Sequence, residues 1–246
     1  MAATKTKAVE TQQVEILETP PLKKHLAEFS IIGDSLLMVH NWSAKALGQM
    51  AAEQFKATWP KKLKKNPVYD FNGATYWIDE QGHELDGKPD LALIADGHVT
   101  EYIKQAEARL DALAAMQSPR FGFPAKGLKA CAIRGAKALG LVMTEMRASF
   151  FIPLEYIEIH GVREMDCAMV RVGRGGTDIR FRPRWNSWWM RFPVEVYTNL
   201  ASLDMVANIM NAGGATCGLG EDRPEKGAGG NGRFHVASDA EIAKLK

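Results

Sequence analysis

A long apolar run, a cysteine framework and a nucleotide-phosphate motif are all missing from this chain of 246 residues. The stretch up to about Glu18 has no apolar core of signal-peptide length, and no later stretch approaches the ~20 apolar residues of a membrane span. Cys131, Cys167 and Cys217 are far apart and odd in number, which disfavours a disulfide framework or a zinc site. We therefore expect a soluble protein of a reducing cytoplasm, with no membrane partner, metal or cofactor.

The glycine-rich segment 218–234 lacks the Gly-Lys-Ser/Thr ending of a P-loop and follows a predicted helix instead of preceding one, which disfavours NTP hydrolysis. Its glycines and cations indicate a mobile loop whose amides and side chains grip a phosphate backbone. A solvent loop between the last helix and the last strand is the alternative. The residues assigned to binding are Arg223, Lys226, Gly229, Gly230, Gly232 and Arg233.

A strong overall charge is lacking too, because the formal net charge is only +2. A histone-like protein is therefore excluded, and any electrostatic footprint must come from local clustering. Residues 163–191 hold seven arginines, three tryptophans and only three acids. Arginine contacts phosphate and tryptophan stacks on bases, so this composition indicates a surface for a nucleic-acid strand. The candidate contacts are Arg171, Arg174, Arg180, Arg182, Arg184 and Trp185.

Apolar periodicity predicts an α+β fold in which helices cover one face of an antiparallel sheet and leave the other face open to ligand. Adjacent Trp188 and Trp189 would point to opposite faces of a strand, so the helices would bury at most one of them. We expect residues 1–24 to form a flexible arm and 25–246 a single domain with an insertion at 56–118. The expected strands are 28–40 (bent), 146–153, 157–161, 168–172, 191–197 and 232–236, and the expected helices are 43–55, 98–116, 126–139 and 202–211.

The segment Pro124-Ala-Lys-Gly-Leu128-Lys129 opens a predicted helix, whose positive end would carry Lys126 and Lys129. Together with the first strand at 31–39 and the glycine-rich segment, it resembles the RAMP superfamily, which includes the backbone and processing subunits of CRISPR effector complexes. The resemblance covers about residues 28–236 and implies a ferredoxin-like (RRM-like) fold. Arg134 takes the place of the family's helix arginine.

This resemblance implies a protein that binds single-stranded RNA or DNA, with subunits stacked side by side as a homo-oligomeric filament. We expect binding without catalysis, because no pair of candidate catalytic residues has a spacing that compels acid–base or metal chemistry. Residues 169–180, 182–185 and 220–224 also resemble proteins of tailed bacteriophages, which places the chain in the cytoplasm of a bacterial host. A virion or assembly protein, whose basic and acidic faces pair between subunits, is one alternative. A RAMP-type endoribonuclease is the other, and its candidate catalytic residues are His40, His160, Asp34 and Asp178; His83, His98 and His235 are considered incidental.

Overall fold

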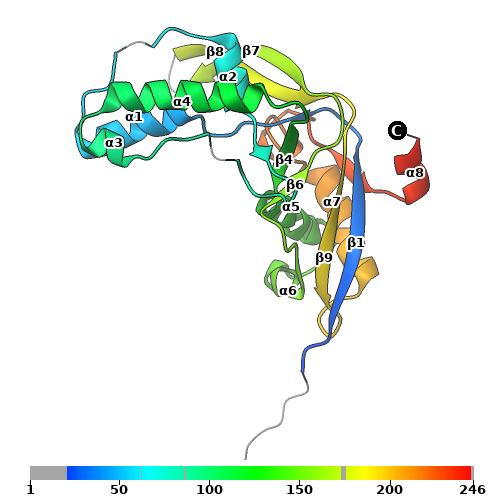
Figure 1. Cartoon of the computed structure of the whole chain (residues 1–246). Helices are drawn as coiled ribbons and strands as arrows, with labels where there is room; N and C mark the ends of the chain where they lie inside the picture. Colours follow the sequence, from blue (N-terminus) through cyan, green and yellow to red (C-terminus); the bar gives the residue numbers. More distant parts are fainter. Residues whose placement is uncertain (1–20, 62, 86, 173–175, 245–246) are drawn as a thin grey trace, which may run out of the picture.

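The computed structural model describes residues 21–61, 63–85, 87–172 and 176–244 and has an α+β architecture with antiparallel strand pairing (Figure 1). Its strands are β1 (Lys24–Gly33), β2 (Leu37–Met38), β3 (Trp77–Ile78), β4 (Arg120–Pro124), β5 (Phe150–Phe151), β6 (Tyr156–Glu158), β7 (Glu164–Val172), β8 (Gly176–Trp185), β9 (Trp189–Tyr197) and β10 (Phe234–Val236). Its helices are α1 (Ala44–Phe55), α2 (Pro67–Gly73), α3 (Ala92–Ala95), α4 (Val99–Ala114), α5 (Ala125–Ala138), α6 (Met143–Ser149), α7 (Leu203–Thr216), α8 (Asp239–Ala243) and the 3₁₀ turn Pro224–Lys226.

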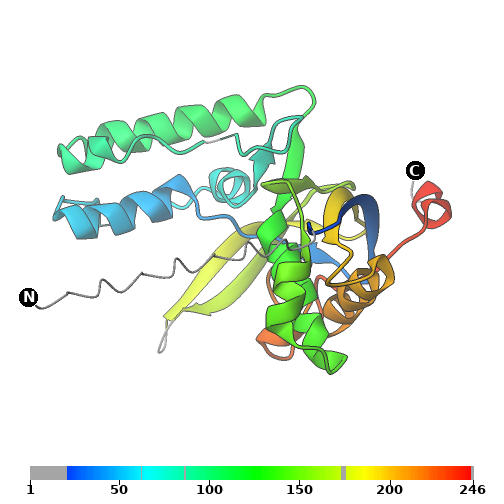
Figure 2. The ribbon, with the colours of Figure 1, turned by 90° about the horizontal axis from the view of Figure 1, so that it is seen from below.

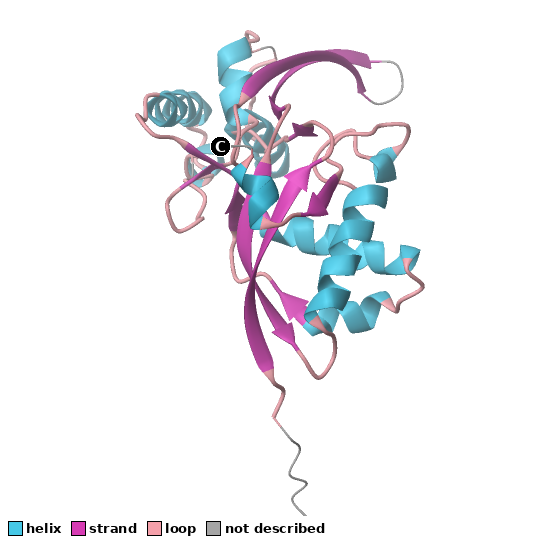
Figure 3. Cartoon of the chain, turned by 90° about the vertical axis from the view of Figure 1, so that its right-hand side faces the viewer, coloured by secondary structure: helices cyan, strands magenta, loops and turns pink. Residues whose placement is uncertain are grey.

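The central sheet has the strand order β10-β1-β9-β5, and helices α5 and α7 pack together on one of its faces (Figure 3). Strand β9 alternates between buried and half-buried residues, as expected for a strand covered on one side. Its buried side chains meet the helices, and they are Met190, Phe192, Val194 and Val196. The main core therefore lies between this sheet and the helix pair.

Helices α5 and α7 approach closely at two glycines. A Cβ atom at Gly135 would overlap the backbone nitrogen of Gly213, and one at Gly213 would overlap the carbonyl oxygen of Cys131. The sequence predicted a helix over 202–211, yet α7 continues through Gly213 and Gly214 to Thr216. Tertiary packing explains the difference, because both glycines are needed where other chain segments touch the helix.

A second, smaller core lies in the helical lobe formed by α1, α3 and α4, which extends to one side of the sheet (Figures 1 and 2). Its buried centre is Tyr102, whose ring meets Trp59 edge-on and whose hydroxyl donates to the carbonyl of Ala44 at 2.9 Å. Ser43 caps α1 by accepting a hydrogen bond from the amide of Ala46, which confirms the predicted start of that helix. No helix in the described ranges has both the length and the apolarity needed to cross a membrane.

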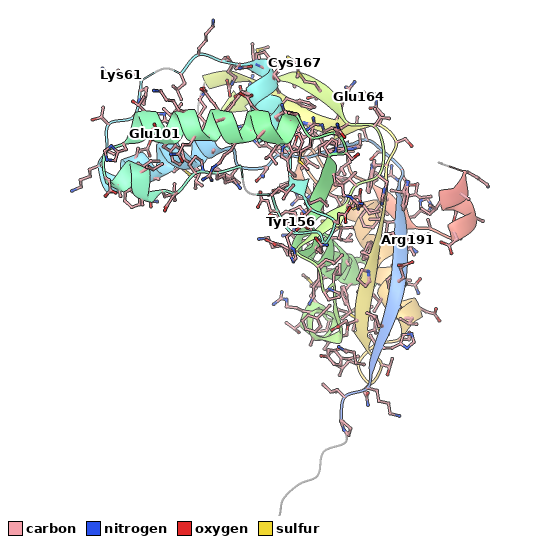
Figure 4. The ribbon with its side chains drawn as sticks, in the orientation of Figure 1. Lys61, Glu101, Tyr156, Glu164, Cys167 and Arg191 are labelled. Carbon is pink, nitrogen blue, oxygen red and sulfur yellow. The ribbon has the colours of Figure 1, made fainter. Side chains whose placement is uncertain are left out.

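Strands β7 and β8 form a long hairpin that extends from the sheet toward α2. The sequence predicted only 168–172 as a strand here and missed β8 entirely. Glu164 and Cys167, both on β7, mark this hairpin at the top of Figure 4. Arginines at every second position of β8 interrupt the apolar pattern that marks a strand, although they follow the strand period of two.

Residues 146–153 were predicted as a strand, but the structure has helix α6 followed by the two-residue strand β5. The buried side chains here are Met146, Ser149 and Phe150, at helical spacing of three and four. Short apolar stretches fit either period, and packing against α5 selects the helix. Strand β1 also begins within the segment assigned to the flexible arm, at Lys24.

Arg163, at the base of the hairpin, contacts α2 and β4. Its guanidinium carbon lies 4.2 Å from the ring centre of Phe121 and 4.3 Å from that of Phe71. The same group donates to Thr75 Oγ1 at 3.0 Å and to Asn72 Oδ1 at 3.2 Å. Burial lowers the pKa of Arg163 to about 10, and no carboxylate of the described residues pairs with it. Aromatic faces and neutral oxygens therefore stabilise this cation.

We expect Arg163→Met to lower the free energy of unfolding by about 2 kcal/mol, because it removes charge-assisted hydrogen bonds and cation–π contacts while keeping an apolar chain. Chemical denaturation followed by circular dichroism measures the change. Arg147→Met removes an exposed arginine of α6 and should change stability by less than about 0.5 kcal/mol. Equal stability of the two variants would show that Arg163 contributes no special anchoring.

Candidate nucleic-acid interface

A cleft of about 400 Å³ lies between the helices α1 and α2 and the β7–β8 hairpin. One wall is the start of α1 with the segment before it, the second is α2, and the third is β8. Its lining includes His40, Trp42, Lys45, Lys65, Asp178, Arg180 and Glu221. The cleft thus joins segments that are far apart in the sequence.

Backbone hydrogen bonds hold the first wall in place. The amide of Val39 donates to the carbonyl of Pro183 on β8 at 3.1 Å, and that of Asn41 donates to the carbonyl of Ala74 after α2 at 2.8 Å. The segment between them is therefore fixed to both other walls. His40 is directed to the base of the cleft, while Trp42 is 61% exposed.

The glycine-rich loop supplies the base of the cleft through Glu221. Gly220 adopts a positive φ of 71°, and a Cβ atom there would overlap the carbonyl oxygen of Met38. The adjacent amide of Glu221 donates to that same carbonyl at 2.8 Å. Glycine is required here because the backbone of the loop must lie directly against the end of β2.

Glu221 connects the cleft to the arginines of the hairpin. Its carboxylate bonds to the guanidinium of Arg182, and Oε1 lies 3.4 Å from Nδ1 of His40 without hydrogen-bond geometry. Interactions with His40 and Arg182 outweigh burial and lower the pKa of Glu221 to about 2. Glu221 is therefore ionised at neutral pH.

Two cations of the cleft have no ion-pair partner among the described residues, namely Lys45 on α1 and Arg180 on β8. Lys65 differs, because its ammonium bonds to Asp178 at 2.8 Å and lies 3.7 Å from Asp70. The first turn of α1 adds the positive end of a twelve-residue helix. An exposed indole and two cations without a close ion pair therefore share one concave space, in which Asp178 also attracts Arg180.

The pairing of β7 with β8 decides which arginines are neutralised. Arg184 lies opposite Glu164, and Arg182 lies opposite Asp166. Arg182 is only 7% exposed and bonds to Asp166 and Glu221, and Arg184 pairs with Glu164 and Asp166. Arg180 lies opposite Ala168, which offers no charge. The prediction that Arg182 contacts a strand is therefore wrong, because the protein itself occupies its guanidinium.

Trp185 does not form a stacking surface, contrary to the sequence-based prediction. Its side chain is 0% exposed and packs in the main core beside Phe121, with ring centres 6.2 Å apart. Trp188 is 1% exposed, while Trp189 is only partly buried and stacks on His160 with ring centres 3.8 Å apart. The expectation that at most one of Trp188 and Trp189 is buried is confirmed.

Of the candidate residues on α5 and the glycine-rich loop, Arg134 and Arg223 line a second, smaller crevice. Arg134 and Arg223 both bind Glu225, and the ammonium of Lys129 lies 3.7 Å from the ring centre of Phe151. Lys126, Lys226 and Arg233 are exposed, with no ion pair among the described residues. These residues do not form one surface with the hairpin arginines.

The glycine-rich loop, predicted to be a mobile clamp, makes hydrogen bonds within itself and to the segment before β2. The amide of Gly232 donates to the carbonyl of Leu36 at 2.7 Å, and that of Asn231 donates to the carbonyl of Asp222 at 3.1 Å. A Cβ atom at Gly229 would overlap the carbonyl of Asp222, whereas Gly230 faces open space. Close backbone packing therefore accounts for Gly229 and Gly232 without a bound phosphate.

The remaining candidates divide between the cleft and other places. His40 and Asp178 line the cleft, whereas Asp34 pairs with His235 at 2.7 Å. Arg171 is exposed on β7, and Arg174 lies outside the described residues.

Trp42 and Lys45 were not selected from the sequence, although a tryptophan directly before a helix cap in a polar segment was the available signal. Within the described ranges, no group of three or more histidine, cysteine or acidic side chains is suited to hold a metal ion.

Comparison with known proteins returned no matching family model and no matching curated protein. The site is therefore interpreted from its own geometry.

Proposed function

We propose that the central sheet and its helices have a ferredoxin-like arrangement of the kind found in the RAMP superfamily. The order β10-β1-β9-β5, all antiparallel, with α5 and α7 on one face, supports this proposal. The helices α1 to α4 and the loops between them would then be an insertion after the first strand. The expected insertion, 56–118, begins after α1. Residues of α1 contribute to the core of this lobe, so the proposed insertion begins before α1.

The protein binds single-stranded nucleic acid in the cleft between the helical lobe and the hairpin. The observation that carries this proposal is the presence of exposed Trp42 and unpaired Lys45 and Arg180 in one cleft. An aromatic ring accepts a base of any sequence by stacking, while the cations contact the phosphates beside it. A duplex would present no free base face to the indole. Preference for single strands follows from that difference.

Fluorescence anisotropy with mixed-sequence RNA and DNA oligonucleotides of about 20 nucleotides tests this proposal. Trp42→Ala should weaken binding about 5- to 100-fold, corresponding to ~1–3 kcal/mol per stacked base. Arg180→Ala should reduce the slope of log K against log salt by about 0.7, since one phosphate contact is lost.

Lys137→Ala provides the matched control, because it removes an exposed cation near the end of α5, away from the cleft. The control should bind like the wild-type protein. Equal affinity and equal salt slope for Trp42→Ala, Arg180→Ala and Lys137→Ala would refute binding in this cleft.

The RAMP resemblance further suggests side-by-side assembly on the strand. Light scattering and the ultraviolet absorbance ratio, measured before and after a high-salt wash, distinguish the two assembly hypotheses. Large particles rich in nucleic acid that dissociate in salt support the coating filament. Particles that lack nucleic acid and resist salt would favour the virion or assembly protein.

A nuclease is the second candidate function, because His40 and Asp178 line the same cleft. The carboxylate of Glu221 beside Nδ1 of His40 could orient the imidazole for proton transfer. RNA cleavage in the presence of a chelator, lost in His40→Ala and kept in His98→Ala, would establish this activity. Intact RNA with every variant would leave binding as the function of the cleft.

A further inference from the structure

Two of the three cysteines lie in the crevice between α5 and the start of the glycine-rich loop. This crevice, about 190 Å³, is lined by Cys131 of α5 and by Cys217 at the end of α7. Cys217 follows Gly213 by four residues and so lies on the helical face that packs against Cys131. The close glycine packing brings the two helix backbones together, so that both cysteines line the same crevice.

The surroundings of the pair distinguish one sulfur from the other. Sγ of Cys217 lies 3.3 Å from Oε2 of Glu225, a carboxylate also bound by Arg134 and Arg223. Cys131 lies among the apolar residues of the main core. The neighbouring Cys131 lowers the pKa of Cys217 to about 7 although burial and Glu225 act to raise it, and Cys217 in turn raises the pKa of Cys131. Cys217 is therefore the sulfur that ionises first, and the thiolate is the reactive form.

We propose that Cys131 and Cys217 form an oxidisable dithiol, with Cys217 as the sulfur that reacts with hydrogen peroxide and Cys131 as the resolving thiol. Although each residue is less than 5% exposed, both cysteines line the crevice, which is large enough for a molecule of peroxide size.

The chemistry balances in two steps. The Cys217 thiolate attacks one peroxide oxygen, the O–O bond breaks, and the hydroxide that leaves takes up a proton as water. The resulting sulfenic acid is attacked by the sulfur of Cys131, so that an S–S bond forms. Hydroxide leaves Cys217 and takes the Cys131 proton as a second water. Two thiols lose two electrons in total, and peroxide is reduced to two molecules of water.

Mass spectrometry of the full chain after treatment with hydrogen peroxide near neutral pH tests the proposal. The wild-type protein should become about 2 Da lighter, and an alkylating reagent should then label Cys167 but neither other cysteine. Digestion should yield one peptide pair joined through Cys131 and Cys217. Cys167→Ser, which removes the exposed cysteine of β7, should still form the disulfide.

Cys217→Ser and Cys131→Ser should both lose the 2 Da change. Cys131→Ser should instead accumulate a sulfenic acid on Cys217 that a cyclic 1,3-dione reagent traps, a product that a merely structural cysteine would not give. Circular dichroism confirms that each variant is folded. The proposal is overturned if Cys131 and Cys217 remain reduced and alkylatable after the peroxide treatment, or if the sulfenic acid of Cys131→Ser lies elsewhere.

Discussion

Trp185→Ala is expected to lower the free energy of unfolding by about 3–5 kcal/mol, the cost of removing a large aromatic side chain from a packed core. The residue is 0% exposed and lies on β8 opposite Leu37 of β2, which is also fully buried. Truncation would leave a cavity where β8 joins the main core. Thermal or denaturant unfolding followed by circular dichroism measures the loss.

A conservative variant separates stability from binding at this position. Nε1 of Trp185 is buried without a hydrogen-bond partner among the described residues. Trp185→Phe removes that unpaired donor and keeps an aromatic ring, so we expect it to cost less than about 1.5 kcal/mol. If Trp185 is a core residue, Trp185→Phe should bind oligonucleotides like the wild-type protein. If Trp185 stacked on a base, the folded variant would bind them more weakly.

Arg182→Ala should destabilise the protein by about 3–5 kcal/mol, because it removes one partner from a nearly buried ion-pair network. Arg182 is bonded to both Asp166 and Glu221, and its loss leaves two carboxylates without their shared cation. Arg180→Ala is the matched control on the same face of the same strand. It should change stability by less than about 0.5 kcal/mol while it weakens nucleic-acid binding.

The cost of Arg182→Ala should depend on pH. The folded pKa of Glu221 is about 2, below its ordinary value of 4.5, so ionised Glu221 stabilises the folded state above pH 4.5. This contribution disappears as the pH falls from 4.5 toward 2. Wild type and variant should therefore differ most near neutral pH and converge in acid. A difference that stays constant between pH 7 and pH 3 would show that the ion pair is not its cause.

Local patterns predicted several elements well because they depend on neighbouring residues. Ser43 and the apolar spacing after it located α1, and the alternation around Val194 located β9. Regular spacing failed where two periods fit the same residues, as at Met146 to Phe150. The site was less predictable, since Arg180 was selected from the sequence but Trp42 and Lys45 were not.

The sequence by itself determined the α+β composition, the main helices and the local concentration of arginine, since these follow from residue order and periodicity. Only the tertiary structure decided which of those arginines can meet a ligand. The register of β7 against β8 places Asp166 opposite Arg182 and uncharged Ala168 opposite Arg180. The glycine-rich loop then adds Glu221 from a distant part of the chain. Charge neutralisation depends on atoms being within a few ångströms, and such distances arise only when remote segments pack together.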